Sequence, residues 1–427
     1  MSLYQLIMSL IVMGLKLRSR MTQFARKGAL DETERLNPPP RRTGDGPLVW
    51  VHGASNGELT AARPLLKDLL ERAPDCELLV TTNSLTARAM VINWALPRTS
   101  SRLAPIDQRS LTATFLENLR PSALVILENE LWPNRLLLCA ARGIPVLVLG
   151  ARMSEKSAKL WQRFSGLGQR LMDTINWLAP QDDASRDRFV KLGLDSDRLG
   201  PTVTLKSAVE VTKAASGLPF DRAQTILAAS THEHEEDIVL DAFSGLIANS
   251  QPDLHLILAP RHPRRRDEIE AMIVKRGLSF ASRSRMQQPD SKTQVYLADT
   301  MGEMPLWYRA AAITFVGGTL SDRGGHTPYE PAAYGSVIVH GPDVANFSSA
   351  YAALAKAGAA REISDSATLE QALSTLLPDP SYLAEIAREA AQTLAPTSGD
   401  TGTARFFNAL ERLAGLTLNV GGPTVAR

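Results

Sequence analysis

The feature that most constrains this chain is a repeated alternation of short apolar runs with longer helical patterns. One series begins near residue 47 and a second begins near residue 225. Such alternation is typical of parallel β-sheets with helices on both faces, because each parallel connection needs a crossover. Between the series lies the segment KAASGLP, residues 213–219, whose small residues and final proline favour a linker. The pattern therefore predicts two doubly wound, Rossmann-like α/β domains.

The expected strands are apolar runs of the length that suits a buried parallel strand. They are residues 48–52, 78–82, 123–127, 146–149 and 175–179 in the first series, and 225–229, 254–259, 295–298, 313–316 and 337–339 in the second. We expect one domain over residues 45–212, the linker at 213–219 and a second domain over 220–415. Sheets of this kind bind ligands beyond the carboxyl ends of their strands. We therefore expect functional residues directly after strands, in a cleft between the domains.

The N-terminal segment is apolar and then basic. Residues 1–15 carry no charged side chain, and Lys16, Arg18 and Arg20 follow at once. This order is the reverse of a secretory signal, and fifteen residues are fewer than the roughly 20 that cross a bilayer as a helix. An apolar segment backed by cations can still lie in an anionic membrane face. We expect residues 1–20 to be a membrane anchor; the alternative is a helix packed on the protein.

Several common chemistries lack their motifs. The first strand is not followed by GxGxxG, and there is no GxxxxGK[ST], which argues against a nicotinamide dehydrogenase and a P-loop NTPase. Cys76 and Cys139 stand far apart, so neither a disulfide framework nor a zinc ribbon is expected. In HEHEE, residues 232–236, alternate side chains of a helix would point in different directions, a poor arrangement for one metal ion. No metal site is expected.

Carboxylates follow two expected strands of the first domain. The turn GASNGE places Glu58 in the first turn of a helix, where the helix dipole favours the charged form. This suits a general base, and it equally suits an ordinary helix-start residue. Glu128 and Glu130 follow the strand at 123–127, and carboxylates are costly as filler at the mouth of a buried strand. At least one of them is expected to face the cleft.

The second domain carries basic and helix-start signals after its strands. Residues 230–233 and 327–330 fit the S/T-x-x-E capping box, and RGGH, with Arg323 and His326, precedes the second box. Paired glycines let a ligand approach the backbone, and arginine pairs bidentately with phosphate. Arg261, at the end of the strand at 254–259, is the expected phosphate ligand, whereas the arginines after it are expected to be solvated. The pattern predicts an anion site.

Taken in order, these segments resemble the 3-deoxy-D-manno-octulosonic acid (Kdo) transferases of bacterial lipopolysaccharide synthesis. The matching stretches lie between residues 51 and 347 and are HGASNGE, ENELWPN, GARMSEKSA, AASTHEHEE, LAPRHP, DTMGE, FVGGTLSDRGGHTPYEPAA and GPDVANF. The resemblance implies a GT-B fold and an inverting glycosyltransferase on the cytoplasmic face of the inner membrane. It also implies transfer of Kdo from CMP-Kdo to a lipid A precursor, with no metal or other cofactor and no nucleic-acid partner.

The resemblance also implies roles for individual residues. Glu58 would be the general base that takes the proton of the acceptor hydroxyl. Glu128 and Lys206 would stabilise the transition state. The CMP part of the donor would be held by Pro260, Arg261, Met301, Gly302, Glu303, Thr327, Pro328, Tyr329 and Glu330.

Four positions depart from the family's usual pattern: Asn56, Ser207, Thr327 and Tyr329. Thr327 can still cap a helix, so that change is mild. Ser207 replaces an aromatic residue beside Lys206, and Tyr329 adds bulk beside the expected CMP site. These changes leave open a divergent paralogue with a related ulosonic acid donor or another lipid acceptor. A catalytically silent, membrane-bound binding protein is the alternative from another class.

Overall fold

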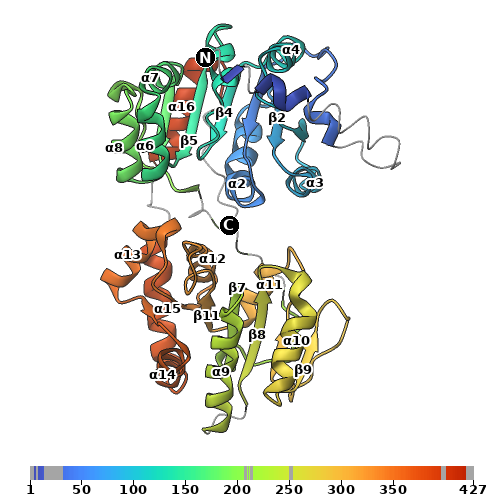
Figure 1. Ribbon diagram of the computed structural model, residues 1–427, viewed down its shortest axis with the longest axis vertical. Coiled ribbons are helices and arrows are strands. Elements are labelled where there is room, and N and C mark those ends of the chain that lie inside the picture. The colour runs from blue at the N-terminus through green and yellow to red at the C-terminus, as the bar shows by residue number, and fades with distance from the viewer. Residues whose placement is uncertain are drawn as a thin grey trace. The chain divides into compact units, whose positions relative to one another are not determined.

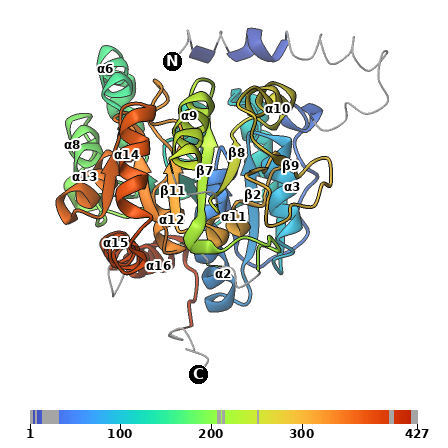
Figure 2. The same ribbon diagram turned by 90° about the horizontal axis from the view of Figure 1, so that it is seen from below.

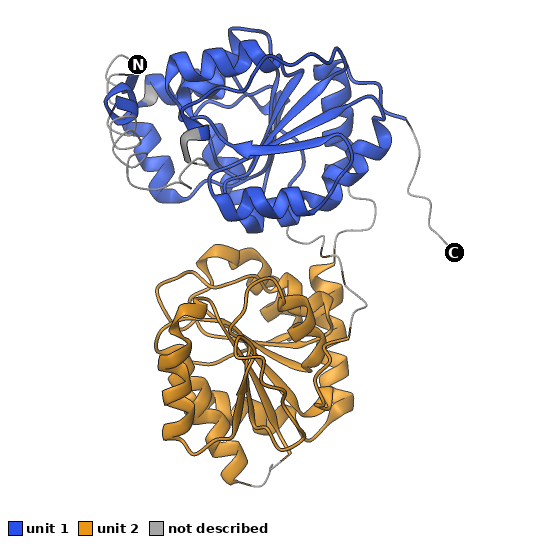
Figure 3. Cartoon of the chain, turned by 90° about the vertical axis from the view of Figure 1, so that its right-hand side faces the viewer, with its two compact units in different colours: residues 1–206, 397–427 blue, residues 207–396 orange. Residues whose placement is uncertain are grey.

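The computed structural model describes residues 4–5, 8–13, 32–205, 209, 211, 215–249, 253–395 and 401–419. The chain divides into two compact units, shown in Figure 3. Unit 1 comprises residues 1–206 and 397–427, and unit 2 comprises residues 207–396. Lys206, Ser207 and residues 213–214 of the expected linker lie outside the described residues.

Unit 1 is built on a six-stranded parallel sheet with the order β3-β2-β1-β4-β5-β6. Its strands are β1 (Leu48–His52), β2 (Glu77–Thr82), β3 (Thr99–Leu103), β4 (Ala123–Leu127), β5 (Val146–Ala151) and β6 (Trp177–Pro180). Its helices include α2 (Asn56–Arg72), α3 (Leu85–Asn93), α4 (Arg109–Leu119), α5 (Pro133–Ala140), α6 (Glu155–Arg163), α7 (Ser165–Met172) and α8 (Asp183–Lys191). The doubly wound fold predicted for this half is confirmed (Figure 1).

The central strands are buried on both faces, which is why they appear in the sequence as continuous apolar runs. In β1, Val49 and Val51 pack into the cluster under α2, while Leu48 and Trp50 pack into the cluster under α4 and α5. The edge strand β3 has the sequence TSSRL and buries fully only Leu103. It carries no apolar run, and this explains why the sequence pattern missed it.

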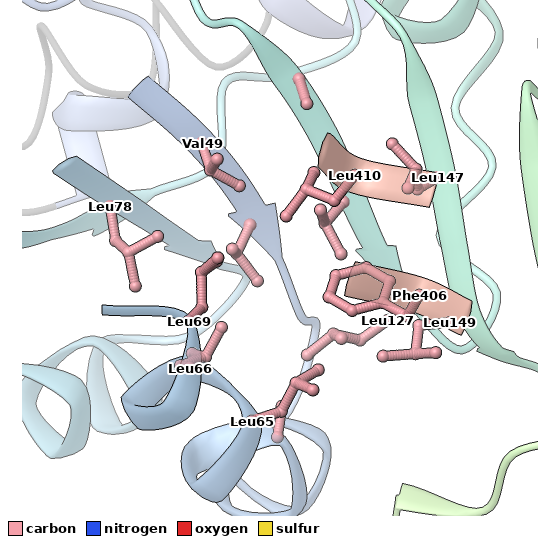
Figure 4. Close-up of a cluster of buried hydrophobic side chains, with 14 of the residues drawn as sticks. Val49, Leu65, Leu66, Leu69, Leu78, Leu127, Leu147, Leu149, Phe406 and Leu410 are labelled. Atoms are coloured by element: carbon pink, nitrogen blue, oxygen red, sulfur yellow. The ribbon is translucent and has the colours of Figure 1, made fainter. Parts of the chain in front are cut away.

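A C-terminal helix, α16 (Thr401–Ala414), corrects the expected domain limits. We predicted that the second domain extends to residue 415, but residues 397–427 belong to unit 1. Phe406, Phe407 and Leu410 are buried in the same cluster as Val49. Figure 4 shows Phe406 and Leu410 beside Leu147 and Leu149 of β5. An amphipathic pattern shows that a helix has an apolar face, but it does not show which sheet that face covers.

Unit 2 has a seven-stranded parallel sheet with the order β13-β12-β11-β7-β8-β10-β9. Its strands are β7 (Thr225–Thr231), β8 (His255–Pro260), β9 (Phe280–Ser282), β10 (Val295–Leu297), β11 (Ile313–Val316), β12 (Val337–His340) and β13 (Ala360–Glu362). Its helices are α9 (Glu235–Ala248), α10 (Arg266–Lys275), α11 (Met304–Ala310), α12 (Tyr329–Ala333), α13 (Ser348–Ala357), α14 (Ser366–Leu376) and α15 (Pro380–Leu394). Helices α9 and α10 cover one face of this sheet, and α11 and α12 cover the other (Figure 2).

The described N-terminal residues form a helical segment with two different faces. Met8 and Val12 pack with Tyr4 against Leu36, Ile106 and Leu111 of unit 1. This agrees with the alternative prediction of a helix packed on the protein. Leu10, Ile11 and Met13 are exposed on the other side. Among the described residues, no helix combines the length and the apolar character needed to span a bilayer.

Candidate active site

Two of the expected catalytic residues follow the strands at which the sheet of unit 1 reverses its order. In unit 1 the reversal lies between β1 and β4, and in unit 2 between β7 and β11. At such points the connections leave on opposite faces and open a ligand crevice at the carboxyl edge. Glu58 follows β1, and Glu128 follows β4. Both lie at the switch point of unit 1.

Glu58 is turned back onto the start of α2. Its Oε2 accepts a hydrogen bond from Ala54 N at 2.8 Å, and its Oε1 accepts one from the Ser55 hydroxyl at 2.8 Å. The Ser55 hydroxyl in turn caps the helix by accepting from Glu58 N at 3.3 Å. The side chain is half-buried, and each of its carboxylate oxygens accepts one of these hydrogen bonds. The contacts suit both a general base and a helix-start residue.

The turn after β1 also has the G-x-S-x-G spacing of a nucleophile elbow, with Ser55 at its centre. An elbow serine sits on a strained turn. Ser55 instead has φ −124° and ψ 162°, which is unstrained extended backbone, and its hydroxyl acts as the N-cap of α2. The structure therefore supports a capping role and gives no indication of a serine nucleophile.

Glu130 forms a network of polar contacts at the carboxyl edge of the sheet of unit 1. Its Oε2 accepts from Asn83 Nδ2 at 3.1 Å and from Trp132 Nε1 at 2.5 Å, and it lies 3.5 Å from His52 Nε2. Burial alone would raise the pKa of Glu130, but these neighbours outweigh it and lower the pKa to about 2. Burial, followed by the charge of Arg135, lowers the pKa of His52 to about 4. Glu130 is thus a charged anchor of this loop.

Glu128 has a left-handed backbone, with φ 59°, directly after β4. Its N–H donates to Leu149 O at 3.0 Å, and its side chain is half-buried. A non-glycine residue in this conformation carries a cost of about 1 kcal/mol or more, and such residues cluster at functional sites. The third residue of the predicted catalytic set, Lys206, lies outside the described residues.

Asp107 is a positioning residue that the sequence pattern did not identify. It is buried and accepts from Asn134 N at 2.9 Å and from Arg135 N at 2.7 Å, at the first turn of α5. The Tyr4 hydroxyl donates to the same carboxylate at 2.6 Å. Asp107 therefore ties the N-terminal segment to the helix that follows Glu130.

In unit 2 the helix after β7 begins later than we predicted. The capping box at residues 230–233 is wrong, because α9 starts at Glu235 and Glu233 is exposed. His234 takes a left-handed conformation, with φ 77°, before the helix. This turn directs Glu235 inward, where its carboxylate accepts from the backbone N–H groups of His232, Gly318, Thr319 and Leu320 at 2.7–3.0 Å. Glu235 therefore holds the turn after β11 against the end of β7.

Basic and imidazole side chains gather beside this turn. His232 and His326 are in direct contact, and His262 packs edge-on against His232 at 5.7 Å between ring centroids. Arg261 and Arg323 are exposed and act electrostatically on the same rings. The side chains predicted to bind an anion therefore gather beside the switch point of unit 2.

The arginines after Arg261 do not all behave as expected. Arg265 was predicted to be solvated, but its guanidinium donates to the fully buried Glu236 at 2.9 Å and to Glu268 at 2.6 Å. A buried carboxylate requires such a partner. Arg265 is therefore structural, whereas Arg261 remains the exposed arginine at the end of β8.

The segment from Met301 to Glu303 follows β10. Met301 is exposed, Gly302 has φ 87°, and Glu303 forms a bidentate ion pair with Arg283 at 2.6 and 3.1 Å. The hydrogen bond from Arg283 is the main cause of the lowered pKa of Glu303. Arg283 was not identified from the sequence. Arg283 and the Thr300 hydroxyl therefore engage both oxygens of the Glu303 carboxylate.

The second capping box is also shifted. Helix α12 begins at Tyr329 with Pro328 before it, and the Thr327 hydroxyl accepts from Tyr329 N at 3.3 Å. Glu330 therefore does not close a box with Thr327 in the way we predicted. Burial raises the pKa of Glu330. Gly324 and Gly325 precede this helix, and both have a positive φ, a conformation that glycine adopts without strain.

Known proteins resemble this chain over most of its length. The family model described as 3-deoxy-D-manno-octulosonic-acid transferase matches residues 25–209. The 3-deoxy-D-manno-octulosonic acid transferase of Bordetella pertussis is 33% identical over 85% of this chain and 86% of that protein. The chain belongs to the Kdo transferase family. The Haemophilus influenzae transferase is 31% identical and covers 80% of each chain. This Kdo transferase is therefore a glycosyltransferase of lipopolysaccharide synthesis, as the sequence motifs predicted.

Solved structures agree with the fold of this Kdo transferase. The UDP-GlcNAc 2-epimerase of Neisseria meningitidis, bound to UDP-GlcNAc, has a TM-score of 0.59 at 13% identity over 86% of this chain and 99% of that chain. The glycotransferase of kitacinnamycin has a TM-score of 0.50 at 17% identity over 88% of this chain and 100% of that chain. At these identities the likeness concerns the fold alone, and it supports the predicted GT-B type.

Proposed function

We propose that this Kdo transferase moves Kdo from CMP-Kdo to a lipid A precursor. The observation that carries this proposal is the cationic cluster at the switch point of unit 2, in a chain of this family. Arg261 and Arg323 act electrostatically on His232, which lies beside a turn whose backbone is held by Glu235. Such a cluster suits the phosphate of a sugar nucleotide, because guanidinium groups pair with phosphate oxygens.

In the proposed reaction a hydroxyl oxygen of the acceptor attacks the anomeric carbon of Kdo. The new C–O bond forms as the bond from that carbon to the phosphate oxygen breaks, so the configuration inverts and CMP leaves with the bonding electron pair. Glu58, which is held at the start of α2 by Ala54 N and the Ser55 hydroxyl, takes the hydroxyl proton. Glu128 and Lys206 stabilise the developing charges. The step as proposed requires no metal ion or other cofactor.

We also propose that the enzyme works at the cytoplasmic face of the inner membrane. The exposed face formed by Leu10, Ile11 and Met13 supports this location, because an apolar helix face can lie in the headgroup region. The cations Lys16, Arg18 and Arg20, which follow in the sequence, would be attracted to anionic lipids. A lipid acceptor would then reach the enzyme from the membrane.

The test is transfer from freshly generated CMP-Kdo to a tetraacylated lipid A precursor, with added sugars counted by mass spectrometry in the presence of EDTA. We expect the wild type to transfer Kdo and Glu58→Gln to lose about 100- to 10,000-fold in rate. Glu71→Gln is the matched control, because Glu71 is exposed near the other end of α2. Equal rates for Glu58→Gln and Glu71→Gln would exclude Glu58 as the base.

Failure of the folded wild type to transfer Kdo would overturn the proposed donor and acceptor. The same assay with a related ulosonic acid nucleotide or another lipid acceptor would then identify a divergent enzyme, as the departures at Ser207 and Tyr329 allow.

A further inference from the structure

The contact between His232 and His326 has no role in the reaction described so far. The two imidazole rings meet edge to edge, with their centroids 5.2 Å apart and their planes within 5° of parallel. Their Nε2 atoms lie 2.9 Å apart, a hydrogen-bond distance. One Nε2 must therefore carry a proton and donate it to the unprotonated Nε2 of the other ring. The pair links the end of β7 to the loop before α12.

Backbone packing holds the two rings in this arrangement. Gly318, with φ 69°, lies against both, since a Cβ there would stand 3.1 Å from His326 Cδ2 and 3.5 Å from His232 Cδ2. The Gly318 N–H is itself fixed by Glu235 at 2.7 Å. His232 N donates to the same carboxylate at 2.9 Å. Both the turn and the backbone of His232 are thus tied to Glu235.

The charged groups around the pair are mostly positive. Arg261, His262 and Arg265 act on it from the loop after β8, and Arg323 acts from the loop after β11. The two carboxylates nearby on α9 are already engaged, Glu235 by backbone amides and Glu236 by Thr231 and Arg265. Burial, followed by these neighbouring charges, lowers the pKa of both imidazoles to about 4. The free pair is therefore neutral at physiological pH.

We propose that the His232–His326 pair takes up one proton when the phosphate of the nucleotide donor binds beside it. This inference rests on the proposed function and adds to it a proton-coupled part of the phosphate site. The proton comes from solvent and adds to the free Nδ1 of the ring that donates its Nε2–H. The resulting imidazolium keeps the hydrogen bond to its partner ring. When the bond to the sugar breaks, the phosphate passes from one negative charge to two, and the imidazolium offsets the added charge.

The size of the effect follows from the charge of the bound phosphate. An opposite charge within hydrogen-bonding range raises an imidazole pKa by about 1 to 3 units, which would bring the pair from about 4 to roughly 5 to 7. At pH 5.5 this corresponds to an uptake of roughly 0.2 to 0.9 proton per nucleotide, and to almost none at pH 8. Because protonation and binding are linked, nucleotide affinity should fall as pH rises through this range.

The test is calorimetry of the full chain with the methyl ester of CMP. Its phosphodiester keeps a single negative charge across the range, as the phosphodiester of the donor does. Titrations at pH 5.5 in two buffers of different ionisation enthalpy give the number of protons taken up. We expect uptake in the wild type and its loss in His232→Gln and in His326→Gln. His234→Asn is the matched control, because His234 is exposed at φ 77°, a conformation that Asn tolerates.

Each of the other possible outcomes overturns a specific part of the proposal. Binding without proton uptake, or uptake that persists in both variants of the pair, overturns the proton-coupled site and leaves the proposed donor intact. Uptake lost only in His262→Gln places the proton on the third imidazole and also overturns the pair. No binding by the wild type, together with no Kdo transfer, overturns the proposed function and this inference with it. Circular dichroism confirms folding, and either variant of the pair suffices if the other is unfolded.

Discussion

Glu235→Gln is expected to destabilise unit 2, because one carboxylate there holds four backbone amides. Oε1 accepts from Thr319 N at 3.0 Å and Leu320 N at 2.9 Å, and Oε2 accepts from His232 N at 2.9 Å and Gly318 N at 2.7 Å. Only 1% of Glu235 is exposed, so water cannot replace a lost partner. A carboxamide has one oxygen and one NH2 group, so two of the four amides would face a donor.

The cost follows from those two amides. Each buried donor left without a partner costs about 1–3 kcal/mol, so the free energy of unfolding of unit 2 should fall by roughly 2–6 kcal/mol. With a urea dependence of about 2 kcal/mol per molar, the unfolding midpoint of unit 2 should fall by about 1–3 M.

The assay is hydrogen exchange, measured against urea concentration, in peptides from β7 and β11, which reports on unit 2 separately from unit 1. Glu233→Gln is the matched control, because it makes the same chemical change two residues earlier at an exposed side chain. We expect the control to stay within about 0.5 kcal/mol of the wild type. If the midpoint shifts of the two variants are equal, the hydrogen bonds of Glu235 do not stabilise the turn and the reasoning is refuted.

Three further predictions address other parts of the molecule. Phe406→Ala should lower the free energy of unfolding of unit 1 by about 3–5 kcal/mol and leave that of unit 2 unchanged, because Phe406 is buried against the sheet of unit 1. Hydrogen exchange in peptides from β4 and β8 measures the stability of the two units separately. Gly318→Ala should lower the free energy of unfolding of unit 2 by about 1–2 kcal/mol, because φ at this position is 69°. A urea midpoint of the variant equal to that of the wild type, measured in β11 peptides, would contradict this. The pKa of His52 is lowered to about 4 by burial, so unit 1 should lose about 3 kcal/mol as pH falls from 6.5 to 4, since the unfolded chain binds the proton first. Urea titrations of His52→Gln should lack this part of the pH dependence, and an unchanged pH profile would argue against it.

Much of each sheet could be predicted from local pattern. The strands at 48–52, 123–127 and 313–316 match β1, β4 and β11 at both ends. These strands are buried on both faces and therefore appear as continuous apolar runs. The carboxylates after β1 and β4 were identified for the same reason, since a charged residue directly after such a run lies at the edge of the sheet. Strand β9 was missed because three residues are too few to show a period.

The helix starts show where local pattern stops being sufficient. Both S/T-x-x-E patterns in unit 2 match the spacing of a capping box, yet α9 starts at Glu235 and α12 at Tyr329. A capping box competes with every other use of the same carboxylate. Glu235 is instead used by amides 83 to 85 positions further along the chain, which no local pattern contains.

The order of elements, the two parallel sheets and the family motifs are therefore properties that the amino-acid sequence specifies locally, because periodicity and spacing act over a few residues. The partners of buried polar groups and the position of α16 could be identified only from the tertiary structure. His232 meets His326 across 94 positions, and Phe406 lies against a sheet that begins at Leu48. Such contacts depend on how separate elements pack, since a side chain's partner is set by distance in space and not by distance along the chain.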